Sequence, residues 1–117
     1  MANTKEILNN LLKVEGIIKA VLVGRDGFVI EAAGDNEIDA EAVGALVTTA
    51  FSSYEVMGKE LGIGGATQIM AEFERSMIMA AAIGPDAVLA VVTGANANLG
   101  SIRYHVKRYS RELETST

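Results

Sequence analysis

Two glycine-rich segments are the first candidates for chemistry in this sequence, because glycine loops often bind phosphate groups. The segment 62–65 follows a predicted helix rather than a strand, so it lacks the setting of a dinucleotide-binding loop. The segment 94–101 precedes a predicted helix, but it contains no lysine and its glycines are wrongly spaced for a phosphate-binding loop. We expect neither segment to bind a nucleotide.

The remaining reactive side chains do not form a catalytic set. The chain has one histidine and no cysteine, which excludes disulfide bonds, thiolate zinc sites and cysteine nucleophiles. His105 has no serine or aspartate in a recognisable relay, and Glu72 and Glu74 are typical of a solvated sheet edge. The sequence therefore does not predict a free-standing small-molecule enzyme, and we expect no catalytic residue, metal site or cofactor.

Composition narrows the possible partners. Half of the 117 residues are apolar, which is more than a small monomer easily buries. The net charge of −5 disfavours binding to nucleic acid, because proteins bind its phosphates through basic patches. The predicted last helix is locally basic, and we interpret it as a solvated face, although contact with an acidic partner stays open. Its charged residues are Arg103, Lys107, Arg108, Arg111, Glu112 and Glu114.

The apolar window 76–93 has the length of a membrane span. Gly84, Pro85 and Asp86 interrupt its centre, and a turn with a charge is not tolerated in the middle of a bilayer. Two strands joined by a turn explain the window better. Polar residues also interrupt the early apolar stretch, which argues against a signal peptide. We expect a cytoplasmic protein without membrane insertion.

Capping and turn residues divide the chain into eight elements. A capping box at Asn3 and Glu6 predicts a helix over about 4–15, and Asp39 predicts the start of a long middle helix to about Leu61. A last helix begins near residue 99. The strands between them are expected at 17–23, 28–33, 66–73, 76–83 and 87–93. Their short connections predict an antiparallel sheet, and the doubly apolar strand 76–83 predicts helices on both faces.

The middle helix carries three rows of residues at helical spacing. The most apolar row is expected to pack on the sheet and consists of Val43, Val47, Ala50, Tyr54, Met57 and Leu61. A row of smaller side chains runs beside it: Ala42, Leu46, Thr49, Ser53 and Val56. The third row is polar but small at its N-terminal end: Glu41, Gly44, Thr48, Ser52, Glu55 and Lys59.

Gly44 stands out in this helix, because an interior glycine costs about 1 kcal/mol relative to alanine. One interpretation is a wide core-facing helix with incidental small residues. The other is a small-residue face that packs on the same helix of a second copy, which would also cover the surplus apolar surface. If strand 66–73 lies at a sheet edge, its open backbone could pair with that copy.

Three motifs together resemble the Roadblock/light-chain-seven domain, which is related in architecture to profilin and longin domains. They are the helix-to-strand segment 11–23, the Asp-Gly hairpin within 25–30, and the Asn98-x-Gly100-x-x-Arg103 start of the last helix. The resemblance spans about 3–113, and we expect residues 1–117 to form one such domain. It implies an α+β fold: an α/β/α sandwich whose five-stranded antiparallel sheet has the order 2-1-5-4-3.

The resemblance also implies dimers joined through the third strand and the middle helix. Members of the family bind Ras-like small GTPases, as MglB-like bacterial regulators do, or serve as scaffold subunits. We therefore expect a homodimer that regulates a Ras-like GTPase; an arginine finger is not implied, although Arg25, Arg75 and Arg103 leave that option open. The expected dimer interface consists of Leu46, Thr49, Ser53, Val56, Gln68, Met70 and Glu72.

The GTPase is expected to bind on the middle helix, where small residues would admit a flat partner. That surface consists of Glu41, Gly44, Ala45, Thr48 and Ser52. An alternative function is a non-catalytic dimerisation or scaffold subunit that has no effect on GTP turnover. A third hypothesis is a small-ligand sensor with a pocket under the turn 62–65.

Overall fold

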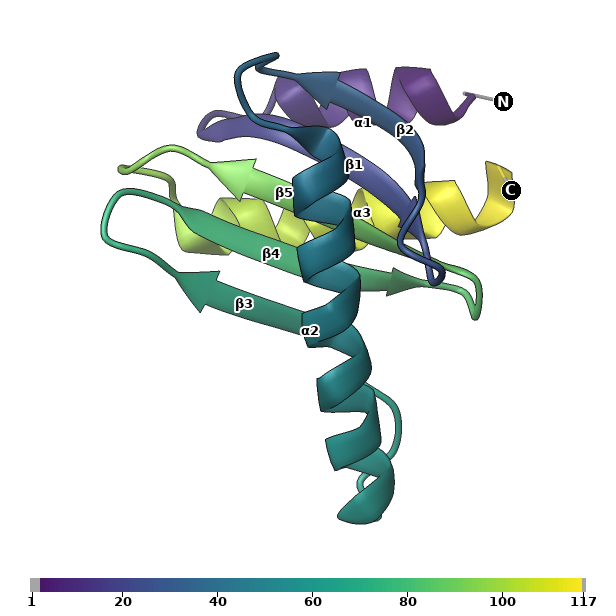
Figure 1. Ribbon diagram of the computed structural model, residues 1–117. Coiled ribbons are helices and arrows are strands. Elements are labelled where there is room, and N and C mark those ends of the chain that lie inside the picture. Colours follow the sequence, from purple (N-terminus) through teal and green to yellow (C-terminus); the bar gives the residue numbers. More distant parts are fainter. Residues whose placement is uncertain (1–2, 117) are drawn as a thin grey trace.

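A five-stranded sheet with helices on both faces makes up the computed structural model, which describes residues 3–116 (Figure 1). The elements are α1 (Thr4–Leu12), β1 (Ile17–Gly24), β2 (Val29–Gly34), α2 (Ala40–Glu60), β3 (Gln68–Glu72), β4 (Met77–Ile83), β5 (Ala87–Thr93) and α3 (Leu99–Ser116). The strand order is β2-β1-β5-β4-β3, and every neighbouring pair is antiparallel. The predicted element order, sheet order and layering are confirmed.

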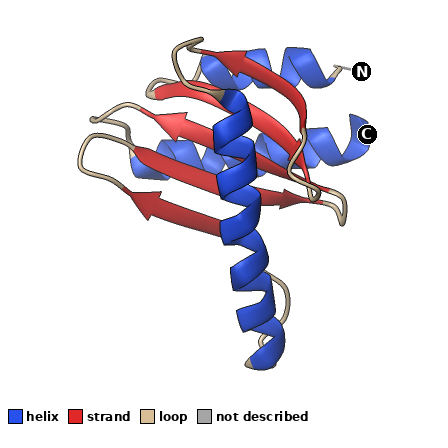
Figure 2. Cartoon of the chain, viewed as in Figure 1, coloured by secondary structure: helices blue, strands red, loops and turns tan. Residues whose placement is uncertain are grey.

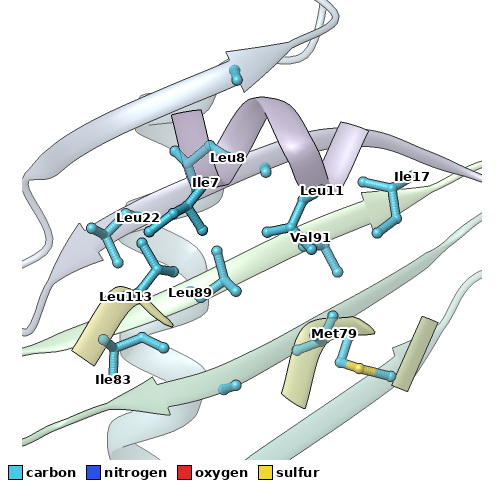
Figure 3. Close-up of a cluster of buried hydrophobic side chains, with 14 of the residues drawn as sticks. Ile7, Leu8, Leu11, Ile17, Leu22, Met79, Ile83, Leu89, Val91 and Leu113 are labelled. Carbon is cyan, nitrogen blue, oxygen red and sulfur yellow. The ribbon is translucent and has the colours of Figure 1, made fainter. Parts of the chain in front are cut away.

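Helices α1 and α3 cover one face of the sheet, and α2 crosses the other (Figure 2). The α1–α3 face holds the larger core, in which Leu8, Leu22, Leu89 and Leu113 are fully buried (Figure 3). Every residue of β5 is buried, because the strand is central and covered on both sides. This two-sided burial explains the continuous apolar run that imitated a membrane span. None of the described helices is long and apolar enough to cross a bilayer.

The helix caps are those that the sequence predicts. The Asp39 carboxylate accepts hydrogen bonds from the backbone N–H groups of Glu41 and Ala42, at 3.0 and 3.3 Å. Asn98 caps α3 by accepting from the Ser101 N–H at 2.9 Å. Side-chain caps of this kind satisfy N–H groups that lack a partner within the helix.

Two element boundaries differ from the prediction. Helix α1 ends at Leu12 rather than near residue 15, because the Val14 N–H bonds to the Leu11 carbonyl and tightens the turn into β1. Val14 still packs against the core from this turn. Strand β3 is also shorter than the predicted 66–73, since its pairing with β4 runs only from Gln68 to Glu72.

The main correction concerns the rotation of α2. The residues of α2 that pack on the sheet are Gly44, Val47, Thr48 and Phe51, while Gly58 is buried against the turn that follows the helix. Of the apolar row predicted to pack there, Val47 is buried and Val43 packs against the core. Its members Tyr54, Met57 and Leu61 are instead 49%, 50% and 65% exposed.

Close approach of the backbones explains this rotation. A Cβ atom on Gly44 would lie only 3.0 Å from the Val23 Cγ2 atom, so a glycine there lets α2 lie directly against β1. Gly58 is buried for a similar reason, because a Cβ atom there would collide with the Gly64 carbonyl oxygen. The two glycines thus lie on the side of α2 that packs against the rest of the chain.

Helix α2 is longer than the part of the sheet on which it packs. It packs mainly on β1, β2 and β5, and its C-terminal turns extend past the edge strand β3 (Figure 1). The predicted glycine end is present: the Ile63 N–H bonds to the Gly58 carbonyl at 3.0 Å and the Gly62 N–H to the Lys59 carbonyl at 3.2 Å. This is the Schellman arrangement that ends many helices.

Candidate protein-docking site

An apolar groove of about 750 Å³ lies between α2 and β3. We call it the α2–β3 groove. Its main apolar lining residues are Val43, Leu46, Ala50, Tyr54, Ile69, Met70, Phe73 and Ile78. The groove exists because α2 packs mainly on β1, β2 and β5. On this face of the sheet, much of β4 and β3 is therefore not covered by a helix of the described chain.

Large apolar side chains continue from this groove onto the projecting end of α2. Leu46 is 70% exposed, Leu61 is 65% exposed, and Ile63 in the turn after the helix is 75% exposed. Contiguous apolar surface of this kind marks interaction sites in soluble proteins. We therefore take the α2–β3 groove and the end of α2 as the candidate site.

Strand β3 adds an open backbone edge to the same site. It is the last strand of the sheet, so its outer N–H and C=O groups have no neighbouring strand. Of its five residues only Glu72 is charged. Edge strands that are not blocked by lysine, proline or a bulge are suited to pairing with a second chain.

The predicted dimer-interface residues divide into two groups. Leu46 lines the α2–β3 groove, and Gln68 and Met70 border it on β3. Val56 is 61% exposed on α2 but does not line the groove. Gln68, Met70 and Glu72 lie opposite Ala81, Met79 and Met77, which belong to the α1–α3 core, so all three side chains are directed to the other side of the sheet.

Thr49 and Ser53 occupy the solvent-facing surface of α2 outside the groove. The Thr49 hydroxyl donates to the Ala45 carbonyl at 2.9 Å, and the Ser53 hydroxyl donates to the Thr49 carbonyl at 3.2 Å. Val43, Ala50 and Tyr54 also line the groove, whereas their spacing in the sequence predicted that they pack on the sheet. Their apolar spacing was the right signal, but it does not distinguish a core row from an interface row.

The predicted GTPase surface needs a correction. Gly44 and Thr48 are buried against the sheet, and the Thr48 hydroxyl donates to the Gly44 carbonyl at 2.8 Å. Gly44 therefore cannot form part of an exposed docking surface, and Thr48 is only 6% exposed where it lines the groove between α2 and the β1–β2 turn. The other three predicted members, Glu41, Ala45 and Ser52, are exposed.

A second groove lies beside this corrected surface. It has a volume of about 400 Å³ between α2 and the β1–β2 turn. We call it the hairpin groove, and its residues include Asp26, Phe28, Ala45, Thr49 and Ser52. Phe28 is 75% exposed at its rim, which the sequence analysis did not anticipate.

Arg25 holds the β1–β2 turn against the rest of the molecule. Its guanidinium forms a 2.5 Å ion pair with Glu55 of α2 and donates to the carbonyl oxygens of Ala87 and Gly84. It also lies over the Phe51 ring, 5.3 Å from the centroid. An arginine with this many partners is a structural tie, whereas Arg75 and Arg103 are exposed.

The side chains considered for chemistry in the sequence have local structural surroundings in the described residues. Residues 3–116 contain no group of three histidine or acidic side chains that could hold a metal ion. The His105 Nδ1 atom lies 2.8 Å from the Ser101 carbonyl, and its ring packs between Tyr104 and Tyr109. The turn 62–65 is exposed and lines none of the grooves described here.

Comparison with known proteins gives consistent matches. The model of the Roadblock/LC7 domain matches residues 3–93. The uncharacterized protein MJ1340 of Methanocaldococcus jannaschii is 37% identical over 108 residues, which are 92% of this chain and 94% of the relative. The gliding protein MglB from Thermus thermophilus has a similar structure, with a TM-score of 0.86 and 25% identity over 95% of this chain and 85% of that one.

Two further structures are similar in fold. The Roadblock/LC7 domain from Streptomyces avermitilis has a TM-score of 0.89 at 22% identity, covering 97% of both chains. Profilin II of Acanthamoeba castellanii has a TM-score of 0.71 at 15% identity, covering 95% of this chain and 96% of that one. The profilin-like architecture that the sequence predicted is thus confirmed.

Proposed function

This chain belongs to the Roadblock/LC7 domain family, and from that premise we propose that it is a homodimeric regulator of a Ras-like small GTPase. The structural likeness to MglB at 25% identity supports this branch of the family. The proposal has two parts, self-association and GTPase binding, which rest on different surfaces and are tested separately.

The uncovered half of the sheet is the observation that carries self-association. Ile69 and Ile78 on β3 and β4 stay only partly buried beside the α2–β3 groove. A second copy related by a two-fold axis would lay its α2 over this half and receive the first α2 in return. The exposed side chains of Leu46, Tyr54 and Met57 would then be buried in both copies.

Sedimentation at micromolar concentration tests self-association. We expect the wild-type protein to be a dimer and Leu46→Asp to raise the dissociation constant by about 30-fold or more, because a buried interface cannot solvate the new carboxylate. The matched control is Ile30→Asp, since Ile30 is 54% exposed on β2 at the opposite edge of the sheet. A monomeric wild-type protein, or equal weakening by both changes, would contradict the proposed interface.

GTPase binding is assigned to the corrected surface beside the hairpin groove. Glu41, Ala45 and Ser52 are exposed there, and Phe28 provides an apolar anchor of the kind that dominates binding energy at interfaces. Two-fold symmetry would give the dimer two such surfaces. The surface lies on a different flank of α2 from the α2–β3 groove, so a GTPase and the second copy would not compete for it.

Capture of a small GTPase by the immobilised dimer, followed by single-turnover GTP hydrolysis, tests this part. We expect the dimer to accelerate hydrolysis and Ala45→Arg to reduce the acceleration by about tenfold, because the large side chain blocks close approach. Ala95→Arg is the control, in the exposed loop at the far end of β5. A GTPase that binds with unchanged hydrolysis would identify a scaffold subunit, the alternative function, and would overturn the regulatory one.

A further inference from the structure

A third groove, of about 470 Å³, runs along the flank of α3 that faces β3 and β4. We call it the α3 groove. Its polar lining residues are Thr67, Gln68, Arg103, Tyr104, Lys107, Ser110, Arg111 and Glu114. It shares only Gln68 with the lining of the α2–β3 groove, and no residue with the hairpin groove.

We propose that the α3 groove binds a polyphosphate, meaning a ligand with two or more linked phosphate groups. Arg103, Lys107 and Arg111 follow one another at intervals of four residues, so they lie on one side of the helix. Each interval advances the helix by about 6 Å. The groove therefore presents a line of positive charges rather than a single point of charge, which fits a ligand whose negative charges also lie in a line.

The three cations are not engaged elsewhere in the described chain. Within residues 3–116, none of them forms an ion pair, and all three are exposed. Arg108 on the same helix is different, because it pairs with Glu112 at 3.7 Å and lies over the Tyr109 ring. A protein with a net charge of −5 has thus left three cations unpaired at one place.

A buried hydroxyl in the groove lacks a partner. Ser110 is 8% exposed, and its Oγ atom has no hydrogen-bond partner among the described residues. A buried polar atom without a partner is costly, and such atoms are rare in folded proteins. An oxyanion bound between Lys107 and Arg111 would supply the missing acceptor.

The opposite wall adds further donors. Within the described residues, Gln68 donates its side-chain N–H only to the Met79 sulfur, at 3.4 Å, and a thioether is a weak acceptor that a phosphate oxygen would replace favourably. Glu114 also lines the groove, so we place the phosphates along Arg103 and Lys107, with the last of them at Ser110.

The chemistry favours phosphate over an acidic peptide. The guanidinium groups of Arg103 and Arg111 suit the bidentate recognition of phosphate oxygens. The volume of about 470 Å³ lies within the range of small-ligand sites. An extended acidic peptide would pass beyond the groove onto the acidic remainder of the surface, whereas a compact polyphosphate concentrates its charge beside the three cations.

Titration calorimetry of the intact protein with inorganic tripolyphosphate tests this site. We expect saturable binding that Lys107→Gln weakens by about tenfold, because a charge-assisted contact is lost. Arg108→Gln is the matched control: it removes the same charge from the same helix but outside the groove, and we expect it to leave the affinity unchanged. ATP titrated in parallel separates recognition of the phosphates alone, which gives equal affinities, from additional contact with the base, which gives tighter binding of ATP.

Ser110→Ala gives an independent readout. We expect it to weaken tripolyphosphate binding while leaving the Tm of the free protein unchanged or raised, because an unsatisfied hydroxyl is removed. A purely structural serine would instead lower the Tm without changing the affinity, and that result would overturn the role of Ser110. The site itself would be overturned by no binding at millimolar tripolyphosphate, by equal weakening from Lys107→Gln and Arg108→Gln, or by binding of an oligoglutamate peptide alone.

Discussion

The two faces of the sheet differ in how much of their surface the helices cover. On the α1–α3 face, two helices cover the strands, and residues such as Leu11, Leu89 and Val106 have no exposed surface. On the other face a single helix crosses the sheet and leaves the α2–β3 groove open. The chain therefore covers one face more completely and leaves apolar surface open on the other.

The difference shows that burial cannot be inferred from apolar character alone. Tyr54, Met57 and Leu61 form a more apolar row than the buried side of α2, yet they are about half exposed or more. The buried side includes Phe51 but also Gly44 and Thr48, because small residues allow close packing on the sheet. The position of a residue around α2 therefore decides whether it is buried, and its apolar character alone does not.

The largest expected effect on the free energy of unfolding comes from shortening one buried and one exposed leucine. Leu89→Ala should lower the free energy of unfolding by about 2–5 kcal/mol, because it leaves a cavity in the covered core. Leu61→Ala should change it by less than about 0.5 kcal/mol, since that side chain is exposed in the single chain. Urea denaturation of dilute protein measures both. Similar losses for the two variants would mean that the faces do not differ.

A second test enlarges two neighbouring positions on α2. Gly44→Leu should cost about 1–3 kcal/mol, because the new side chain meets Val23 and forces the helix away from β1. Ala45→Leu adds bulk to the exposed flank and should change stability by less than about 0.5 kcal/mol. The comparison of the two urea midpoints locates the side of α2 that packs on its own chain, and an equal effect would refute the rotation described above.

The smallest test compares the two helix caps. Asn98→Ala should lower the global free energy of unfolding by about 1 kcal/mol, the usual value of a side-chain cap. Asp39→Ala should cost about the same locally, but we expect its effect mainly as faster amide exchange within α2, because that helix packs on only half of the sheet. If Asp39→Ala changed the global stability as much as Asn98→Ala, the two faces would unfold as one unit.

Local signals in the sequence predict most of the architecture. Asp39 and Gly62 mark the ends of α2, the Asp26-Gly27 pair marks the first hairpin, and the residues 84–86 mark the last one. Each of these caps and turns is set by residues that are close to one another in the sequence, so the sequence alone predicts it. The strand order followed from the family resemblance, and the structure confirms it.

Features that depend on distant residues were not predictable in the same way. The rotation of α2 is decided by contact between Gly44 and Val23, and the hairpin groove by the approach of Phe28 to the helix. The basic row of α3 was visible, but it was interpreted as a solvated face. Only the fold shows that Ser110 is buried beside those cations and has no hydrogen-bond partner in the described chain.

The open edge of β3 exposes the single chain to aggregation during and after synthesis. Natural edge strands often carry a lysine, a proline or a bulge that prevents aggregation, and β3 contains no lysine or proline and pairs with β4 in a continuous register. Next to an apolar groove, such an edge accepts an extended strand from any chain that reaches it. If the chain forms the proposed homodimer, rapid capture by a like copy during synthesis would protect it against misassembly.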